Sequence, residues 1–254
     1  AAVTDQEFAR TSTDGLLGRT QVAPRSAWGV VRVIQEFGDQ GSTVGAHLTA
    51  VHRGMDPDDP LAQVLSRNAV TGGADARIRF ADRTYEASFN VGLTHIDGEP
   101  DAITGYQLRN SHLFQRVDQP IVRLDPTRRA LDGLQVTGRI NKIAGRHWLW
   151  NANVMIESPE FEPSDFGRLN FAGDYSARAQ LTYRETVPGR FLRGYSFGPT
   201  LGHYSYYDRD LGNRYNLGVN TSVTFLNFWS TSVNVTRYLR GLDAQLTRGG
   251  PVMG

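Results

Sequence analysis

The chain has 254 residues, 39% of them hydrophobic, and its 27 lysines and arginines nearly balance its 26 aspartates and glutamates. A formal net charge of +1, with basic residues scattered along the chain, gives no indication of nucleic-acid binding. The absence of cysteine excludes disulfides and cysteine-based metal sites. No apolar run is as long as the about 18 residues that a transmembrane helix needs.

The first 27 residues carry no basic segment followed by an apolar one, so they do not form a signal peptide. Either a signal has been removed or the chain begins within a longer protein, and we favour the second interpretation. We therefore interpret residues 1–254 as a single β-barrel segment and a fragment of a longer chain, with a loop over residues 1–27.

Ten segments then alternate between apolar and polar residues, which is the pattern of a β-strand. The clearest pair spans residues 69–95, where Val70 to Phe80 and Tyr85 to Leu93 alternate around a turn at 81–83. The length of these runs matches that of a tilted membrane-crossing strand, which has about 10 residues. In chain order the expected strands are 28–37, 43–52, 69–80, 84–95, 131–142, 147–157, 174–184, 193–206, 213–226 and 228–238.

The apolar side of these strands is only weakly hydrophobic, because many of its residues are Gly or Ala. Such a surface suits a lipid-facing wall better than a tightly packed core. Aromatic residues lie close to the short turns, as an interfacial girdle requires. They are Phe37, Phe80, Tyr85, Trp148, Tyr183, Phe225 and Trp229.

Connection lengths alternate between short and long, as in barrels with short periplasmic turns and longer extracellular loops. The short connections are 38–41, 81–83, 143–146, 185–189 and 226–227, and the long ones are 53–67, 158–173 and the region around 208–212. Because short and long connections alternate along the chain, residues 96–130 are expected on the side of the long loops. We interpret them as one extracellular excursion with a short helix over 101–116. Residues 241–254 are expected to form a loop on the same side.

The pattern predicts an all-β fold, an antiparallel up-and-down transmembrane β-barrel with about ten strands of a larger barrel and one short helix in a long extracellular loop. A closed ten-stranded barrel is a physical alternative, because even strand numbers from about 8 upwards occur. A soluble, secreted β-sandwich with a glycan-binding role is a second alternative, because half-buried soluble sheets also alternate.

Four strings in the loops resemble one bacterial family. They are HLFQRVDQPIVRLDPTRRALDG (112–133), NKIAGRHW (141–148), SPEFEPSDFG (158–167) and TRGGP (247–251). This pattern is similar to domain-of-unknown-function family 5916, although Glu160 and Ser164 stand where Gly and Asn are typical. The resemblance implies an outer-membrane barrel, often preceded by a carbohydrate-binding module of the family 9 type. It implies no activity and no catalytic residues.

Candidate site residues are few. The sequence has no metalloprotease, nucleophile-elbow or phosphate-loop motif, so we expect no enzyme, no cofactor and no metal. Acidic residues at 157–165 have the oxygen chemistry of a Ca²⁺ site, but their spacing matches no EF-hand and a stiff loop is the simpler interpretation. Five arginines on the polar side of the strands are candidates for a cationic lumen wall: Arg77, Arg79, Arg139, Arg178 and Arg184. The alternative is cross-strand pairing with acids such as Asp75 and Glu86.

The leading functional hypothesis is a bacterial outer-membrane barrel that contacts the lipid bilayer and conducts small solutes or saccharides. The alternative is a membrane anchor that displays surface loops or a carbohydrate-binding module. The sequence indicates no oligomeric state.

Overall fold

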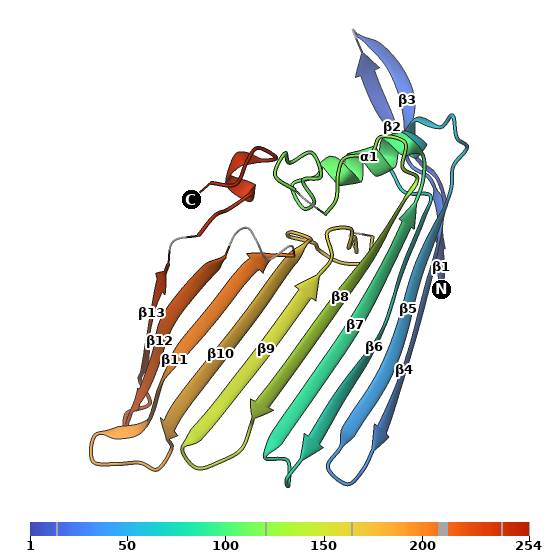
Figure 1. Cartoon of the computed structure of the whole chain (residues 1–254). Coiled ribbons are helices and arrows are strands. Elements are labelled where there is room, and N and C mark those ends of the chain that lie inside the picture. The colour runs from blue at the N-terminus through green and yellow to red at the C-terminus, as the bar shows by residue number, and fades with distance from the viewer. Residues whose placement is uncertain (14, 120, 164, 208–212, 240, 254) are drawn as a thin grey trace.

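The computed structural model describes residues 1–13, 15–119, 121–163, 165–207, 213–239 and 241–253, and one large antiparallel sheet dominates them (Figure 1). Eleven strands form it, in the order β1-β4-β5-β6-β7-β8-β9-β10-β11-β12-β13. They are β1 (Ala2–Thr4), β4 (Arg25–Phe37), β5 (Ser42–Gly54), β6 (Asn68–Phe80), β7 (Tyr85–Asp97), β8 (Ala130–Lys142), β9 (Trp148–Glu157), β10 (Asp174–Glu185), β11 (Leu192–Tyr206), β12 (Arg214–Phe225) and β13 (Ser230–Tyr238). From β4 onward each strand pairs with the next one in the chain, which confirms the all-β, antiparallel, up-and-down prediction.

The ten strands expected from alternation correspond to β4–β13, and several are longer than the pattern indicated. The strand expected at 28–37 begins at Arg25, and the strand expected at 131–142 begins at Ala130. The turn expected at 81–83 adopts positive φ at all three residues, with values of 51°, 52° and 60°. Consecutive left-handed residues reverse the chain sharply and keep this connection short.

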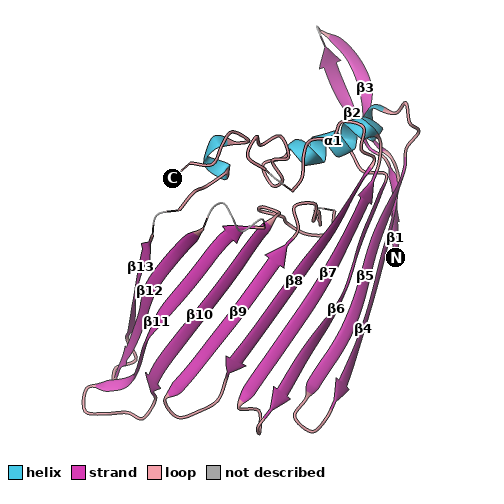
Figure 2. Cartoon of the chain, viewed as in Figure 1, coloured by secondary structure: helices cyan, strands magenta, loops and turns pink. Residues whose placement is uncertain are grey.

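The expectation of a plain loop over residues 1–27 is wrong. β2 (Glu7–Thr13) and β3 (Leu16–Ala23) form a separate hairpin, and β1 pairs with the start of β4 (Figure 2). The hairpin is exposed along most of its length, so it has no apolar face for alternation to reveal. In the sequence, the dipeptide Asp14-Gly15 is a hairpin signal, and Gly15, just before β3, has φ +82°.

The register places the two sides of the predicted strands on two faces of the sheet. Directly paired residues share a face, because side chains alternate along each strand. We call the face that bears Phe89, Val91 and Leu93 of β7 the apolar face, and the face that bears Ser88 and Asn90 the polar face. Most large side chains of the apolar face are exposed.

The excursion after β7 contains one α-helix, α1 (Pro100–Leu108), as predicted, but it ends earlier than residue 116. Pro100 occupies the first turn, where its missing N–H costs no hydrogen bond. Arg109 leaves the helix with ψ 151°, and Leu113 has φ 54°, so the chain turns back on itself there. Among the described residues, no helix has the length and apolar character needed to cross a membrane.

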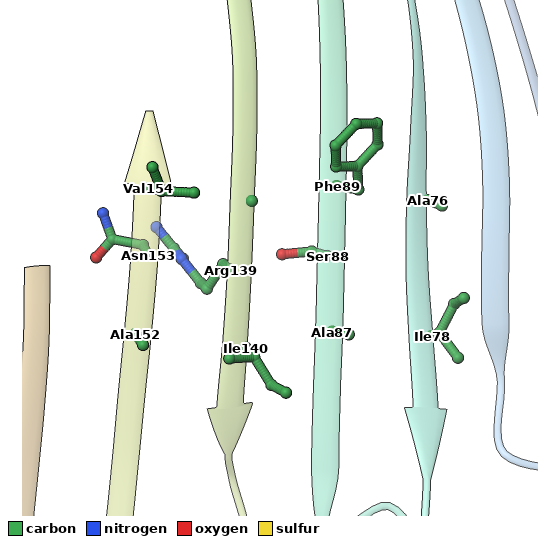
Figure 3. A pocket seen from close by; sticks show the side chains of 11 residues that line it. Ala76, Ile78, Ala87, Ser88, Phe89, Arg139, Ile140, Ala152, Asn153 and Val154 are labelled. Carbon is green, nitrogen blue, oxygen red and sulfur yellow. The ribbon is translucent and has the colours of Figure 1, made fainter. Parts of the chain in front are cut away.

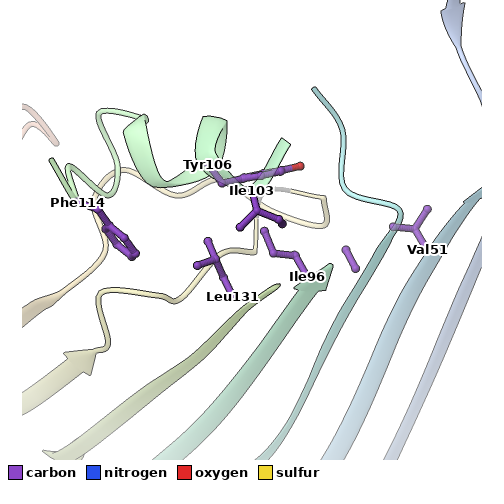
Figure 4. Close-up of a cluster of buried hydrophobic side chains, with 7 residues drawn as sticks. Val51, Ile96, Ile103, Tyr106, Phe114 and Leu131 are labelled. Carbon is purple, nitrogen blue, oxygen red and sulfur yellow. The ribbon is translucent and has the colours of Figure 1, made fainter. Parts of the chain in front are cut away.

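The excursion and the loop after β9 fold back onto the polar face, and we call residues 98–129 and 158–173 the capping segments. Beneath them the polar face becomes apolar along one register row, through Val51, Ala69, Ile96 and Leu131 of four neighbouring strands. Ile103, Tyr106 and Phe114 of the first capping segment pack on this row in the main buried cluster (Figure 4). The core of the molecule therefore lies at one end of the sheet.

The connections separate by length as the sequence predicted. The short turns lie at one end of the sheet, and α1, the N-terminal hairpin and the C-terminal residues lie at the other (Figure 1). A short 3-10 helix, Pro60–Gln63, lies between β5 and β6, and another, Gln245–Thr247, follows β13. The long loop expected around 208–212 lies outside the described residues.

Candidate functional site

The polar face is the candidate site, because it gathers all five arginines singled out in the sequence. Arg77 and Arg79 lie on β6, Arg139 on β8, and Arg178 and Arg184 on β10. The pairings Arg77↔Ser88↔Arg139 and Arg139↔Asn153↔Arg178 put three of them in one row of the sheet. The period of two along each strand thus places these side chains on one side.

Two acids of the polar face are neutralised by arginines, and only one of those arginines belongs to the predicted set. Arg79 Nε lies 3.0 Å from Glu86 Oε2, on the paired position of the next strand. Asp75 pairs instead with Arg32 of β4, Nη2 to Oδ1 at 2.8 Å. Cross-strand pairing, the alternative raised by the sequence, therefore holds for Arg79.

Arg184 occupies a different environment near the short turns. Its Nη2 donates to the carbonyl of Gly145 at 3.2 Å, and its backbone N–H donates to the carbonyl of His147 at 2.8 Å. These contacts tie the end of β10 to the preceding turn, so Arg184 has a structural role. The structure therefore separates it from the arginines of the central row.

The remaining three arginines, Arg77, Arg139 and Arg178, are exposed, and within the described residues they form no ion pair and no side-chain hydrogen bond. A pocket of about 430 Å³ lies between Arg77 and Arg139, and its lining also includes Asn90 and Thr137. The polar face therefore presents free guanidinium groups beside hydroxyl and amide side chains.

The capping segments are tied to the sheet by a buried polar network. Arg53 of β5 forms an ion pair with Asp165 and donates to the carbonyl of Ser66 at 2.9 Å. The Ser66 hydroxyl donates to Asp165 Oδ2 at 3.0 Å and accepts from the Tyr106 hydroxyl at 3.3 Å. Arg53 of β5 and Ser66 of the loop before β6 thus both contact the Asp165 carboxylate of the second capping segment, and Tyr106 of α1 joins the network through Ser66.

His112 and Glu162 join the two capping segments to each other. His112 Nε2 and Glu162 Oε2 are 2.8 Å apart, and the two side chains are 0% and 1% exposed. The other ring nitrogen of His112 lies 2.8 Å from the carbonyl oxygen of Pro159, so it carries the proton that is donated there. Glu162 also receives Arg109 at 3.8 Å and its backbone N–H donates to Thr94.

Gly133 of β8 allows the second capping segment to approach the sheet. A Cβ built there would lie 2.2 Å from Phe161 Cα and 2.5 Å from Phe161 N, both backbone atoms. Only glycine fits such a close approach of two backbones. The ring of Phe161 extends towards Gly92 on the neighbouring strand.

The acidic loop weighed as a Ca²⁺ site directs its carboxylates to protein partners. Glu160 pairs with Arg128 at 2.6 Å, Asp165 pairs with Arg53, and Glu157 accepts from Gln135 at 2.5 Å. These contacts hold the loop against the sheet and its neighbouring segment, as a stiff structural loop would be held.

A turn in the first capping segment is held by Asp125. The Thr127 hydroxyl and the Thr127 backbone N–H both donate to its carboxylate, at 2.7 and 2.9 Å, and they lower the pKa of Asp125 below its ordinary value. The fully buried Gln107 bonds both the N–H and the carbonyl of Asp125. The turn is thereby fixed against α1.

Sequence reasoning missed the roles of Arg53, His112 and Glu162. The histidines were treated as dispersed polar residues, and His112 and Glu162 are 50 positions apart. No spacing rule connects them. The sequence signal was the presence of both strings, 112–133 and 158–167, because His112 of the first contacts Pro159 and Glu162 of the second.

These features define a class: an antiparallel up-and-down β-sheet protein whose polar face is capped at one end by two ordered loops. A family model for a domain of unknown function, DUF5916, matches residues 2–243. The chain therefore belongs to that family, and the resemblance of its loop strings is confirmed. No curated protein and no solved structure matches the chain.

Proposed function

We propose that this chain forms the wall of a bacterial outer-membrane β-barrel that conducts small solutes or saccharides along its polar face. The observation that carries the proposal is the exposed apolar face. Val33 of β4, Phe89 of β7 and Leu201 of β11 are 64%, 51% and 50% exposed, although all three lie within long strands. Monomeric soluble proteins rarely expose contiguous apolar patches of more than a few hundred Å².

Aromatic residues border the apolar face at the level of the short turns, where interfacial side chains are expected. Phe80 stacks on Tyr85 with ring centroids 5.5 Å apart, and Trp148 meets Tyr183 at 5.1 Å. Phe197 continues the array at 5.4 Å from Tyr183. Packed aromatics at one level match the girdle of a membrane barrel.

Polar and aromatic groups border the same face at the opposite end. His203 stacks on Tyr215 at 4.5 Å, and His95 Nδ1 lies 2.7 Å from Asp132 Oδ1. The space between these two borders is mostly apolar and includes a shallow groove of about 470 Å³ on β6–β9 (Figure 3). Apolar residues such as Ile78, Phe89 and Ile140 line most of it, and Ser88, Arg139 and Asn153 of the polar-face positions also contribute to the lining. A hydrocarbon layer would fill such a groove with acyl chains.

The strand lengths also suit a membrane. β4 to β8 each have 13 residues, which exceeds the about 9–11 residues that a tilted strand needs to cross a bilayer. Within the described residues the sheet has two edges, along β13 and along most of β4. The proposal requires these edges to be paired in the membrane, because unsatisfied backbone groups are not tolerated in lipid.

Cell fractionation of the full-length protein, followed by gel mobility with and without heating in detergent, tests the location. We expect recovery in the outer membrane and a heat-dependent shift. Planar-bilayer conductance then tests the conduit, and a sealed barrel would overturn that part. A protein that is soluble without detergent would overturn the membrane wall and favour the secreted sandwich.

The second candidate function is a membrane anchor that displays its loops, and the ordered capping segments favour it. Replacing residues 109–129 with a Gly-Ser linker distinguishes the two. Higher conductance would mean that the segment gates a conduit. An unchanged, closed barrel that inserts normally would favour the anchor.

A further inference from the structure

One register row on the polar face carries three arginines on alternate strands. From β5 to β10 the row runs through Thr43, Arg77, Ser88, Arg139, Asn153 and Arg178, each directly paired with the next. We call these six residues the arginine row. Ser88, Arg139 and Asn153 lie at one level on three neighbouring strands (Figure 3).

The charges of the arginine row are not used within the described residues. Other arginines of the polar face pair with the acids nearest to them, Arg32 with Asp75 and Arg79 with Glu86. Arg77, Arg139 and Arg178 are exposed and unpaired there. Three free guanidinium groups on one face are suited to ligands that carry negative charge, because guanidinium binds carboxylate, sulfate and phosphate through two parallel hydrogen bonds.

The spacing selects the shape of such a ligand. Neighbouring strands are about 4.8 Å apart, so the backbones of arginines on alternate strands are about 10 Å apart. A single small anion can engage one of these groups, whereas a longer molecule with several acidic groups engages all three. Ser88 and Asn153 lie between the arginines and offer a hydroxyl and an amide to uncharged polar groups of the same molecule.

We propose that the arginine row binds an elongated acidic saccharide, one that carries several carboxylate, sulfate or phosphate groups. The pocket between Arg77 and Arg139 takes one acidic group, and Asn90 and Thr137 at its wall contact the adjoining hydroxyls. The Asp75 carboxylate also lines this pocket, and Arg32 neutralises it. Arg178 takes a second group further along the row. This inference rests on the proposed function, because it names the class of saccharide that the polar face would bind and conduct.

Isothermal titration of the full-length protein in detergent with a short dextran sulfate chain, which is long enough to reach all three arginines, tests the inference. Uncharged dextran of the same length is the second probe. The test variant is Arg77→Gln/Arg139→Gln/Arg178→Gln. The control variant is Arg10→Gln/Arg19→Gln/Arg190→Gln, which removes the same charge from the N-terminal hairpin and a short turn. A third variant with lysine at positions 77, 139 and 178 keeps the charge but loses the bidentate geometry.

We expect dextran sulfate to bind the wild type, with an affinity that falls as salt rises, and to bind the glutamine variant at least about tenfold less tightly. The control variant should match the wild type, and the lysine variant should lie between them. Failure of the wild type to bind, equal binding by the glutamine variant, or equally tight binding of uncharged dextran would overturn the inference.

Conductance of the same samples separates this inference from the proposed function. A barrel that binds dextran sulfate through the arginine row but does not conduct would retain the binding site and reject the conduit. A barrel that conducts without binding would retain the conduit and reject the arginine row as a saccharide site. Gel mobility of each variant with and without heating shows whether it has folded like the wild type.

Discussion

His112 and Glu162 meet between the two capping segments with 2.8 Å between Nε2 and Oε2, and neither side chain has appreciable contact with water. The pair joins residues that are 50 positions apart in the chain. Since the remaining ring nitrogen of His112 is satisfied by the Pro159 carbonyl, the imidazole is bonded at both ends. The two segments are thereby held together as one cap over the end of the polar face.

Replacing His112 with alanine should loosen this cap. The change removes one hydrogen-bond partner of the buried Glu162 carboxylate, which keeps Arg109 at 3.8 Å, and we expect a cost of about 1–3 kcal/mol. We expect faster proteolysis at residues 109–129 and, in a conducting barrel, higher open probability.

Glu160→Gln is the matched control for the cap, because Glu160 lies on the same segment and forms a partly exposed ion pair with Arg128. Its effect should stay within about 1 kcal/mol. Equal protease sensitivity of the two variants would argue against His112 as the joint between the segments.

Gly133→Ala should displace the second capping segment from the sheet. A Cβ at this position would overlap backbone atoms of Phe161, so the segment must move, at a cost of about 1–3 kcal/mol. Hydrogen exchange should rise in residues 158–173 and stay unchanged at the short turns. Gly29→Ala is the control, because a Cβ at Gly29 meets nothing within 4 Å.

Phe89 and Asn90 are neighbours on β7 that face opposite sides of the sheet. An arginine introduced at each position in turn tests whether the apolar face contacts lipid. Phe89→Arg puts a cation on the apolar face, which costs about 2–4 kcal/mol near the bilayer midplane. Asn90→Arg puts the same cation on the polar face, where it stays hydrated. We expect the first variant to lose heat-modifiable, membrane-inserted protein and the second to assemble. If both assembled equally, the apolar face would not contact lipid.

Thr127→Val should make the turn at Asp125 more sensitive to acid. Both donors to the carboxylate come from Thr127, and they lower the pKa of Asp125, so this stabilisation is present above the unfolded pKa of about 3.9 and is lost as pH falls through the lower folded pKa. The hydroxyl-deleted variant should lose it at a higher pH. Following the carboxyl chemical shift of Asp125 by NMR measures the difference, and identical titration curves would contradict the assignment.

Much of the sheet was predictable, because its information is local. Val70 to Phe80 alternate with a period of two, and a pleated strand sends such residues to opposite faces wherever the strand lies. The alternation therefore placed Arg77 and Arg139 on one face before any pairing was known. The presence of a short helix after β7 was also predictable, although the helix ends before Arg109 and not at residue 116.

The N-terminal hairpin was not predicted, because it lacks an apolar side. Arg10 and Arg19 occupy paired backbone positions and are both exposed, so alternation carries no signal there. Only the dipeptide Asp14-Gly15, a hairpin signal in the sequence, could have indicated the hairpin. Local turn chemistry can indicate a hairpin even when no face is buried.

From β4 onward, the sequence by itself determined which residues form strands, which side of each strand is apolar, and where the short turns lie, since these follow from the period of the pleat and the chemistry of short turns. Only the tertiary structure decided which charges are neutralised and where the long loops rest. Arg79 pairs with Glu86, whereas Arg77 has no ion pair within the described part of the chain, and His112 contacts Glu162. These contacts depend on strand register and on the close backbone approach at Gly133. Side chains brought together over such separations leave no periodic pattern in the chain, so their pairing emerges only when the sheet has been assembled.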